Sequence, residues 1–370
     1  MNALTILAAV LLFGIIILVH EWGHYFVAKR CGIRVNEFSL GMGPKLFQFS
    51  KGETKYTVRL LPIGGYCAME GEDEETDDPR GFTKQKVWKR LLVVVAGAVM
   101  NFILGFAVLV TALSVCVRKE AGRDYALYST TQIAELSEEA LSYQTGLRAG
   151  DTVTAVDGSP IFSDFDLMYL MQTDEDGVLD LTVCREIDGK KQKFTLEGVT
   201  FPYAEDEHGS YLNYEFKVFG EKKTVWTTLK RAAKLEASYG ALVWRSLGGI
   251  ITGQFKLNDL SGPVGTVGVI GDAVNNAVQD ADKGNLDGLY SLLMLVVLIT
   301  VNVGVFNLLP LPALDGGKIF FLVINQLFLL LFKKQIPAKF ENYIHVAGFI
   351  LLMILMAVVM FQDIWKIFSR

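Results

Sequence analysis

The sequence predicts a polytopic α-helical membrane protein with about four transmembrane helices and an α/β domain inserted between the second and the third. Of its 370 residues 51% are hydrophobic, and the mean hydropathy is +0.34, which is high for a soluble protein of this length. The apolar residues gather in runs long enough to cross a bilayer. Between the second and third runs, residues 120–203 instead alternate in polarity and contain turn signals.

The first expected span covers residues 4–28. Its sequence is apolar from Leu4 to Val19 apart from Thr5, and a helix of this length crosses a hydrocarbon core of about 30 Å. A cleaved signal peptide is the alternative. No Lys or Arg precedes the run, and no clear small-residue cleavage site follows it, so we expect a retained span.

The other expected spans cover residues 91–117, 289–312 and 345–361. A further apolar run, residues 319–332, has only 14 residues between Lys318 and Lys333. Because this run is short for a crossing, we expect an interfacial or re-entrant helix there. If it did cross the membrane, the chain would have five spans.

The basic residues predict the orientation of the spans. The loop between the first two spans is rich in Lys and Arg, whereas the extreme N-terminus has none. This bias places the loop in the cytoplasm, and the N-terminus and residues 118–287 outside.

Charge and cysteine content exclude two classes of protein. The formal net charge is −5, with an acidic cluster at "EGEDEETDDPR", so we expect no nucleic-acid partner. The four cysteines have no CxxC spacing, so a disulfide framework is not expected.

Two histidines and a glutamate stand near the end of the first span, in "ILVHEWGHYFVAKR". His20 and His24 are four residues apart, so a helix places them on one face with Glu21 beside them. Zinc is bound by neutral imidazole nitrogens, and a neighbouring carboxylate can act as general base for a metal-bound water. A structural pair of snorkelling or packed histidines is the alternative, but ionisable groups inside a span usually serve a function.

A zinc site of this kind needs a third protein ligand and an open position. His345 and His208 are candidates, but Asp315 in "NVGVFNLLPLPALDGGKIF" lies at the inner end of the third span, on the same side as His24. Pro310 and Pro312 interrupt the helix there. We therefore expect Asp315 to be the third ligand.

These motifs resemble the site-2 proteases, which are intramembrane zinc metalloproteases. "HEWGH" in the first span and "NLLPLPALDGG" in the third match in order, and "KRLLVVVAGAVMNF" matches the second-span motif through Gly97 and Asn101. "FSLGMGPKLF" and "YTVRLLPIGGYCAMEGE" match as well. Within the family, the chain most resembles the bacterial regulator-of-sigma-E protease branch.

The resemblance implies roles for individual residues. The implied ligands of Zn2+ are His20, His24 and Asp315, and Glu21 would activate water. The positions implied to contact unwound substrate are Asn302, Asn307, Pro310 and Pro312. For these Asn and Pro residues, and for Asn101, helix packing is the alternative. Residues 38–70 would form a membrane-associated β-hairpin whose edge is presented to an extended substrate.

The inserted segment, residues 120–203, resembles a PDZ domain. Its "GLRAGDTVTAVDG", residues 146–158, matches the family pattern, and a hairpin is expected around Asp188 and Gly189. The sequence departs from the pattern at Thr145 and at residues 138–140, which puts the peptide groove in doubt. The domain would either bind a peptide by strand addition or filter substrates by size. A single such domain is typical of the Gram-positive form.

The segment 204–288 is expected to hold an amphipathic interfacial helix and a linker. Apolar residues recur at helical spacing within residues 222–253, with Trp226 and Trp244 as interface anchors. "SGPVGT", residues 261–266, is expected to be a loop.

The resemblance implies four segments in all: residues 1–117, 120–203, 204–288 and 289–370. The chain would be a zinc metalloendopeptidase in the plasma membrane of a bacterium, with its active site towards the cytoplasm. It would cleave single-span membrane proteins, such as anti-sigma factors, or signal-peptide remnants, in regulated intramembrane proteolysis. The alternatives are a membrane-tethered PDZ scaffold and a metal transporter.

Overall fold

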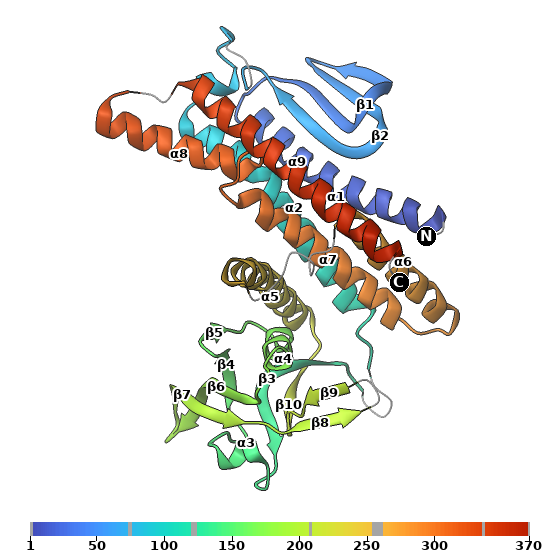
Figure 1. The fold of residues 1–370 in the computed structure, drawn as a ribbon, viewed down its shortest axis with the longest axis vertical. Helices are drawn as coiled ribbons and strands as arrows, with labels where there is room; N and C mark the ends of the chain where they lie inside the picture. The colour runs from blue at the N-terminus through green and yellow to red at the C-terminus, as the bar shows by residue number, and fades with distance from the viewer. Residues whose placement is uncertain are drawn as a thin grey trace. The chain divides into compact units, whose positions relative to one another are not determined.

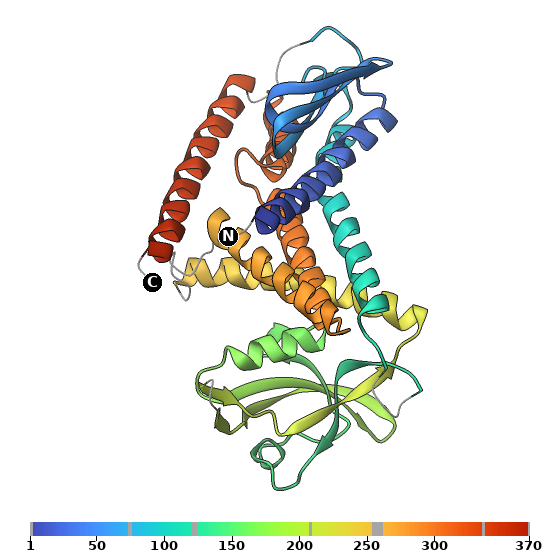
Figure 2. The ribbon, with the colours of Figure 1, turned by 90° about the vertical axis from the view of Figure 1, so that its right-hand side faces the viewer.

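A computed structural model of the chain describes residues 3–72, 76–119, 124–206, 209–253, 262–334 and 337–368. The chain forms two compact units. One unit joins Met1–Val108 to Val243–Arg370, and the other is Leu109–Leu242. The long apolar helices and a β-hairpin belong to the first unit, and a larger β-sheet belongs to the second (Figures 1 and 2).

Among the described residues, five helices are long and apolar enough to cross a membrane. They are α1 (Ala3–Arg30), α2 (Val87–Val115), α7 (Asp287–Leu308), α8 (Asp315–Phe332) and α9 (Ala338–Phe368). The helix that contains the run 319–332, α8, also includes the polar start Asp315-Gly-Gly-Lys and so has 18 residues. Its expected interfacial or re-entrant placement stays a prediction. The third expected span is shorter than predicted, because α7 ends at Leu308, before the two prolines.

The expected linker before the third span is also partly wrong. Residues Pro263–Asp282 form a 20-residue helix, α6, with Pro263 in its first turn. Asp363 of α9 accepts hydrogen bonds from the backbone N–H groups of Gly262 (3.2 Å) and Gly265 (2.8 Å). This carboxylate satisfies free N–H groups at the start of α6, so the helix begins inside the segment that was expected to be a loop.

The expected β-hairpin is present and extends slightly further than predicted. β1 (Val35–Lys51) pairs antiparallel with β2 (Thr54–Met69), with several register shifts. Residues 45–51 pair with 54–59, whereas residues 37–40 have partners on both sides, in 55–58 and in 65–68. The hairpin is therefore folded back on itself into a sheet whose segments lie in the order 45–51, 54–59, 37–40, 65–69. Residues 65–69 form one edge of this sheet.

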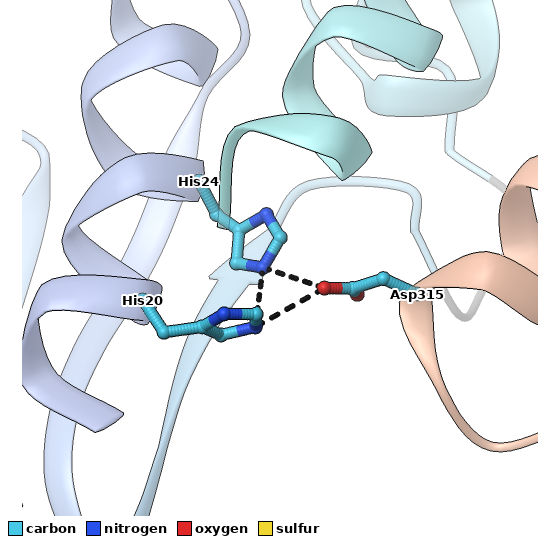
Figure 3. A group of neighbouring side chains, drawn as sticks. All are labelled: His20, His24 and Asp315. Carbon is cyan, nitrogen blue, oxygen red and sulfur yellow. Dashed lines mark hydrogen bonds and ion pairs between the residues drawn. The ribbon is translucent and has the colours of Figure 1, made fainter. Parts of the chain in front are cut away.

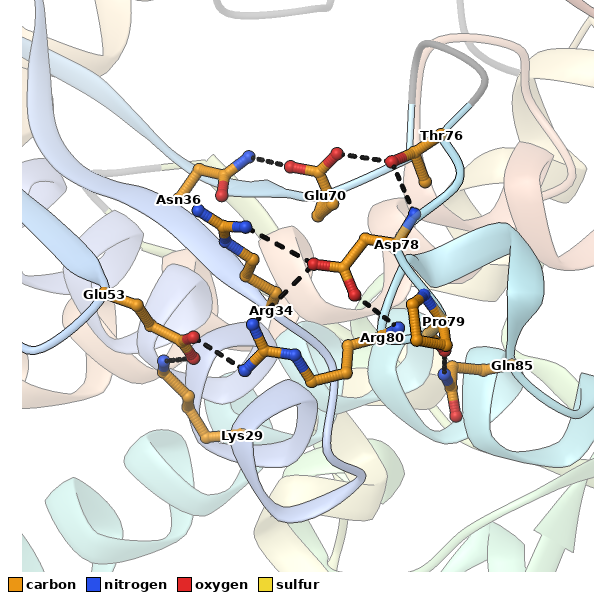
Figure 4. Close-up of polar contacts among 10 residues, drawn as sticks. All are labelled: Lys29, Arg34, Asn36, Glu53, Glu70, Thr76, Asp78, Pro79, Arg80 and Gln85. Atoms are coloured by element: carbon orange, nitrogen blue, oxygen red, sulfur yellow. Dashed lines mark hydrogen bonds and ion pairs between the residues drawn. The ribbon is translucent and has the colours of Figure 1, made fainter.

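A polar network attaches the hairpin to the end of α1 (Figure 4). Glu53, in the hairpin turn, accepts from Lys29 of α1 (2.8 Å) and from Arg80 (2.7 Å). Arg34 pairs with Asp78 at 3.3 Å. Exposed pairs of this kind contribute about 0–1 kcal/mol each, so the network acts mainly by fixing the orientation of the hairpin. Its members are Lys29, Arg34, Asn36, Glu53, Glu70, Thr76, Asp78, Pro79, Arg80 and Gln85.

The second unit is built around a β-sheet. The sheet has the strand order β10-β3-β4-β6-β7, with β5 paired to β4, and β8 pairs separately with β9. The strands are β3 (Leu127–Leu136), β4 (Thr152–Val156), β5 (Ser159–Pro160), β6 (Val178–Ile187), β7 (Lys190–Thr200), β8 (Tyr203–Asp206), β9 (Gly209–Leu212) and β10 (Phe216–Lys222). The helices α3 (Leu141–Gln144) and α4 (Asp164–Gln172) interrupt this order. The expected hairpin is confirmed: β6 and β7 pair around Asp188 and Gly189, both at positive φ.

The expected amphipathic helix is present as α5 (Val225–Thr252). Ala232, Leu235 and Tyr239 on its apolar face are buried, whereas Val225 is 81% exposed. Ser238 of α5 donates to the buried Asp166 of α4 (2.5 Å). The expected interface anchors Trp226 and Trp244 are exposed.

We expect Glu236 on α5 to make the stability of the protein depend on pH. Its Oε1 is buried without a hydrogen-bond partner among the described residues, and burial raises the pKa of this carboxyl from 4.5 to about 7. As the pH rises through this interval, the unfolded chain ionises first, so the folded state loses stability. We expect Glu236→Gln to raise Tm over wild type at pH 8 and to leave it unchanged at pH 4.5. Differential scanning fluorimetry measures this, and Glu197→Gln, at an exposed position on β7, should match wild type at both pH values.

Candidate metal centre

Two buried imidazoles on α1 point towards the same place (Figure 3). His20 and His24 are one helical turn apart and only 8% and 7% exposed. Their rings meet edge to face, with centroids 4.8 Å apart, and their Nε2 atoms are 3.2 Å apart. The expected pair of convergent nitrogen atoms is therefore present.

Asp315 reaches these nitrogens from the first residue of α8. Between α7 and α8 the chain turns through Pro310 and Pro312, which cannot continue the helix. Asp315 Oδ2 lies 3.1 Å from Nε2 of both His20 and His24. Residues almost 300 positions apart thus form a triangle with sides of 3.1–3.2 Å.

The triangle fits a zinc ion. Tetrahedral ligands at about 2.0–2.1 Å from zinc lie roughly 3.3 Å from one another, close to the observed separations. Asp315 Oδ2 is buried without a hydrogen-bond partner among the described residues, as expected of an atom that serves as a ligand. Two imidazoles and one carboxylate also leave the fourth position open, which is typical of catalytic zinc.

Each imidazole has a partner at its other nitrogen. His24 Nδ1 lies 2.8 Å from the carbonyl oxygen of Val93, so Nδ1 carries the proton and Nε2 is free to bind metal. His20 Nδ1 lies 3.2 Å from the side-chain nitrogen Nδ2 of Asn101, and Asn101 Oδ1 has no partner among the described residues. With its amide oxygen towards the ring, Asn101 would accept the proton of His20 Nδ1.

Glycines allow α2 to approach the metal ligands. A Cβ atom on Gly97 would lie 2.3 Å from His24 Nε2 and 2.6 Å from His20 Cε1. A Cβ atom on Gly23 of α1 would lie 2.5 Å from the carbonyl oxygen of Ala96. The resemblance had indicated Gly97, and the structure supplies its physical reason. Gly23 was missed, although it lies inside the HEWGH motif.

The triangle opens into a cavity of about 540 Å³. Glu21 lines it beside the two histidines, and residues 65–69 of β2 form one wall. A Cβ atom on Gly65 would lie 3.3 Å from Glu21 Cγ, so the strand runs directly past this carboxylate. Of the four expected substrate contacts only Asn307 is in the cavity wall. Asn302, Pro310 and Pro312 are outside it.

An ion pair at the cavity was not anticipated from the sequence. Lys318 Nζ lies 2.6 Å from Glu72 Oε1, and both residues line the cavity. Lys318 follows Asp315 by one helical turn, so the pair joins the start of α8 to the segment after β2. The spacing of Asp315 and Lys318 was visible in the sequence, but the partner 246 residues away was not.

His345 contacts the turn before Asp315 and is not part of the His20, His24 and Asp315 group. Its Nδ1 accepts a hydrogen bond from the backbone N–H of Ala313 at 3.0 Å. Ala313 has φ +73°, a left-handed conformation that is unfavourable for alanine. The hydrogen bond stabilises this strained turn two residues before Asp315. His208, the other alternative, lies outside the described residues.

We expect His345→Ala to weaken zinc binding about tenfold, as is usual when a residue that orients a metal ligand is lost. Competition with a chromophoric chelator, on purified protein, measures the affinity. His345→Asn should restore most of it, because its side-chain oxygen can replace Nδ1 as acceptor. Equal affinity of wild type and His345→Ala would contradict the supporting role.

Helices of membrane length supply a buried His-His-Asp triangle, and the carboxylate of Glu21 lies beside it. The fold and the site together define a class, the multi-pass membrane zinc hydrolases. Comparison with known proteins identifies the family. A model of peptidase family M50 matches residues 8–355. The chain therefore belongs to peptidase family M50, and it is a zinc metalloprotease whose cofactor is Zn2+.

Individual relatives extend over the whole chain. A chain assigned as a zinc metalloprotease from Clostridium acetobutylicum is 32% identical over 365 residues, covering 98% of both chains. The zinc metalloprotease RasP of Shouchella clausii is 28% identical, covering 99% of this chain and all of its own. The regulator of sigma-W protease RasP of Bacillus subtilis is 26% identical, covering 98% and 99%. The resemblance to site-2 proteases is confirmed, and the branch with a single PDZ domain stays a prediction.

Proposed function

We propose that this protein is an intramembrane endopeptidase of a bacterial plasma membrane. It would cleave single-span membrane proteins, such as anti-sigma factors, or signal-peptide remnants, in regulated intramembrane proteolysis. The observation that carries the proposal is the buried metal triangle, whose ligands come from two apolar helices of membrane length. The similarity to RasP of Bacillus subtilis, which is named as the regulator of sigma-W protease, supports anti-sigma factors as the substrate class.

In the proposed site His20, His24 and Asp315 hold the zinc ion. When bound, zinc supplies a Lewis acid for the scissile carbonyl and lowers the pKa of a coordinated water. Glu21 accepts a proton from the attacking water and passes it to the nitrogen of the leaving amine. The carbonyl of Val93 keeps His24 in the tautomer that presents Nε2. Asn101, with its amide oxygen turned towards Nδ1, would do the same for His20.

The substrate would bind as an extended strand. A helical substrate has its carbonyls engaged in hydrogen bonds, so it must unwind before water can attack. Residues 65–69 of β2 lie at the edge of the folded hairpin and in the wall of the cavity. Strand addition there would hold the unwound segment beside Glu21. Asn307, in the cavity wall, would contact the same segment. Asn302, Pro310 and Pro312, which lie outside that wall, would contact the substrate beyond the cavity.

The proposed orientation follows the positive-inside rule. The lysine- and arginine-rich segment between α1 and α2 would face the cytoplasm, with the metal centre towards that side. The N-terminus and the sheet unit would lie outside. We propose a PDZ-like role for residues 120–203, either peptide binding or exclusion of substrates with large outer domains, and α5 would lie at the outer membrane surface.

Cleavage in liposomes tests the proposal. The wild type is reconstituted with a tagged single-span substrate whose membrane segment contains a Gly-Pro pair, with an all-leucine version of the same segment, and with soluble casein. We expect cleavage of the first substrate only, inside its membrane segment, because the Gly-Pro pair unwinds the helix. Rapid hydrolysis of casein with both membrane substrates intact would contradict an intramembrane function.

A further inference from the structure

A second cavity, of about 380 Å³, lies within the sheet unit at the junction of α2 and α5. Its apolar wall includes Val110 of α2 and Leu229 of α5. Its polar lining includes Ser114 and Lys223. An apolar cavity with one cationic group is suited to an amphipathic, negatively charged ligand.

The cation in this cavity is held by backbone carbonyl groups. Lys223 Nζ donates to the carbonyl oxygens of Ser114 (2.8 Å) and Val117 (2.6 Å) at the end of α2. Among the described residues no acidic group forms a salt bridge with Lys223. Burial lowers the pKa of the Lys223 ammonium, so an anionic ligand there would stabilise its charged form. An ammonium has three donors, and the two backbone bonds leave one donor for such a ligand.

The surroundings place this cavity at a membrane surface. α2 is of membrane length, so its last residues, with Ser114 among them, would lie at the boundary between lipid and water. Val225, which lines the cavity, and its neighbour Trp226 in the first turn of α5 are 81% and 74% exposed. Exposed aromatic and aliphatic residues next to lysines are typical of segments that lie in this boundary.

We propose that the cavity binds the headgroup of an anionic phospholipid. The phosphodiester would accept hydrogen bonds from Lys223 and from the hydroxyl of Ser114. The acyl chains would follow Val110 and Leu229 into the bilayer. Because Lys223 also bonds to the end of α2, the bound lipid would connect this helix to the start of α5. This site is separate from the metal centre and does not depend on the proposed substrate.

Native mass spectrometry of the purified full-length protein tests the site. The protein is titrated with phosphatidylglycerol or phosphatidylcholine of identical acyl chains. We expect one phosphatidylglycerol to bind wild type about tenfold more tightly than phosphatidylcholine. Both lipids have the phosphodiester, but the choline ammonium of phosphatidylcholine would lie beside the charged Lys223 and be repelled by it. Lys223→Gln should abolish this preference. Lys190→Gln, which removes the same charge at the exposed β6–β7 turn, should preserve it.

A second variant keeps the charge and fills the space. Ala126 lines the cavity and is partly exposed, so Ala126→Phe should exclude the lipid while Lys223 remains. Equal binding of the two lipids by wild type, or an undiminished preference in both Lys223→Gln and Ala126→Phe, would overturn the proposal. Displacement of phosphatidylglycerol by millimolar inorganic phosphate would also overturn it, because the site would then select free phosphate.

Discussion

Replacing Glu21 by glutamine is expected to abolish cleavage while zinc is retained. Glutamine has nearly the same shape as glutamate but cannot accept a proton, and loss of a general base typically costs about a thousandfold in rate. Glu21 is not one of the three groups whose atoms form the ligand triangle, so the affinity for zinc should change little. Cleavage of the single-span substrate and zinc content are measured on the same preparations.

Glu135→Gln is the matched control. The Glu135 side chain is 70% exposed on β3, so this variant should cleave at the wild-type rate. If Glu21→Gln retained wild-type cleavage, the assignment of Glu21 as general base would be wrong. Loss of zinc from Glu21→Gln would instead give this residue a role in binding the metal.

Replacing Gly97 by alanine is expected to remove zinc and activity together. The added methyl carbon would lie 2.3 Å from His24 Nε2, the atom that faces the metal. That separation is too short for any contact without a bond, so either α2 or the imidazole must move. A displacement of about 1 Å at a catalytic group can cost about a hundredfold in rate. Zinc per chain and substrate cleavage measure the effect.

Gly268→Ala provides the control for Gly97→Ala. Gly268 lies inside α6, and a Cβ atom there would meet no other atom within 4 Å. Alanine should therefore stabilise this helix slightly, by about 0.5–1 kcal/mol, with zinc content unchanged. If Gly97→Ala and Gly268→Ala behaved alike, close approach of α2 to the ligands would not be needed for metal binding.

The ligand triangle could be predicted because its parts have local signatures. His20 and His24 are spaced for one helical face, and Asp315 follows a proline-interrupted apolar run. The β6–β7 hairpin could be predicted for a similar reason, since Asp188 and Gly189 favour its turn. Each of these features depends on a few neighbouring residues.

Features that depend on distant partners could not be predicted. The start of α6 lies in "SGPVGT", which was expected to be a loop, but Asp363, about 100 residues away, binds the first N–H groups of the helix. The role of His345 depends on the strained conformation of Ala313, which no residue type signals. The folded-back pairing of residues 37–40 with two parts of β2 depends on register shifts that alternation in the sequence does not show.

The length of α8 shows how composition can mislead. Asp315, two glycines and Lys318 look unlike the start of a transmembrane helix, so the expected helix began at residue 319. In the structure the helix begins at Asp315, which is favourable because a carboxylate is stabilised at a helix N-terminus. The same residue thus starts the helix and completes the ligand triangle.

Zinc K-edge X-ray absorption on the purified wild type tests the central claim most directly. The account predicts one zinc per chain with only nitrogen and oxygen neighbours at about 2.0–2.1 Å. It also predicts outer-shell scattering from two imidazoles. In Asp315→Ala, which is expected to lose the metal, the zinc signal should fall to background. A sulfur neighbour at about 2.3 Å, which would require one of the four cysteines, or a wild type that binds no zinc, would contradict the account.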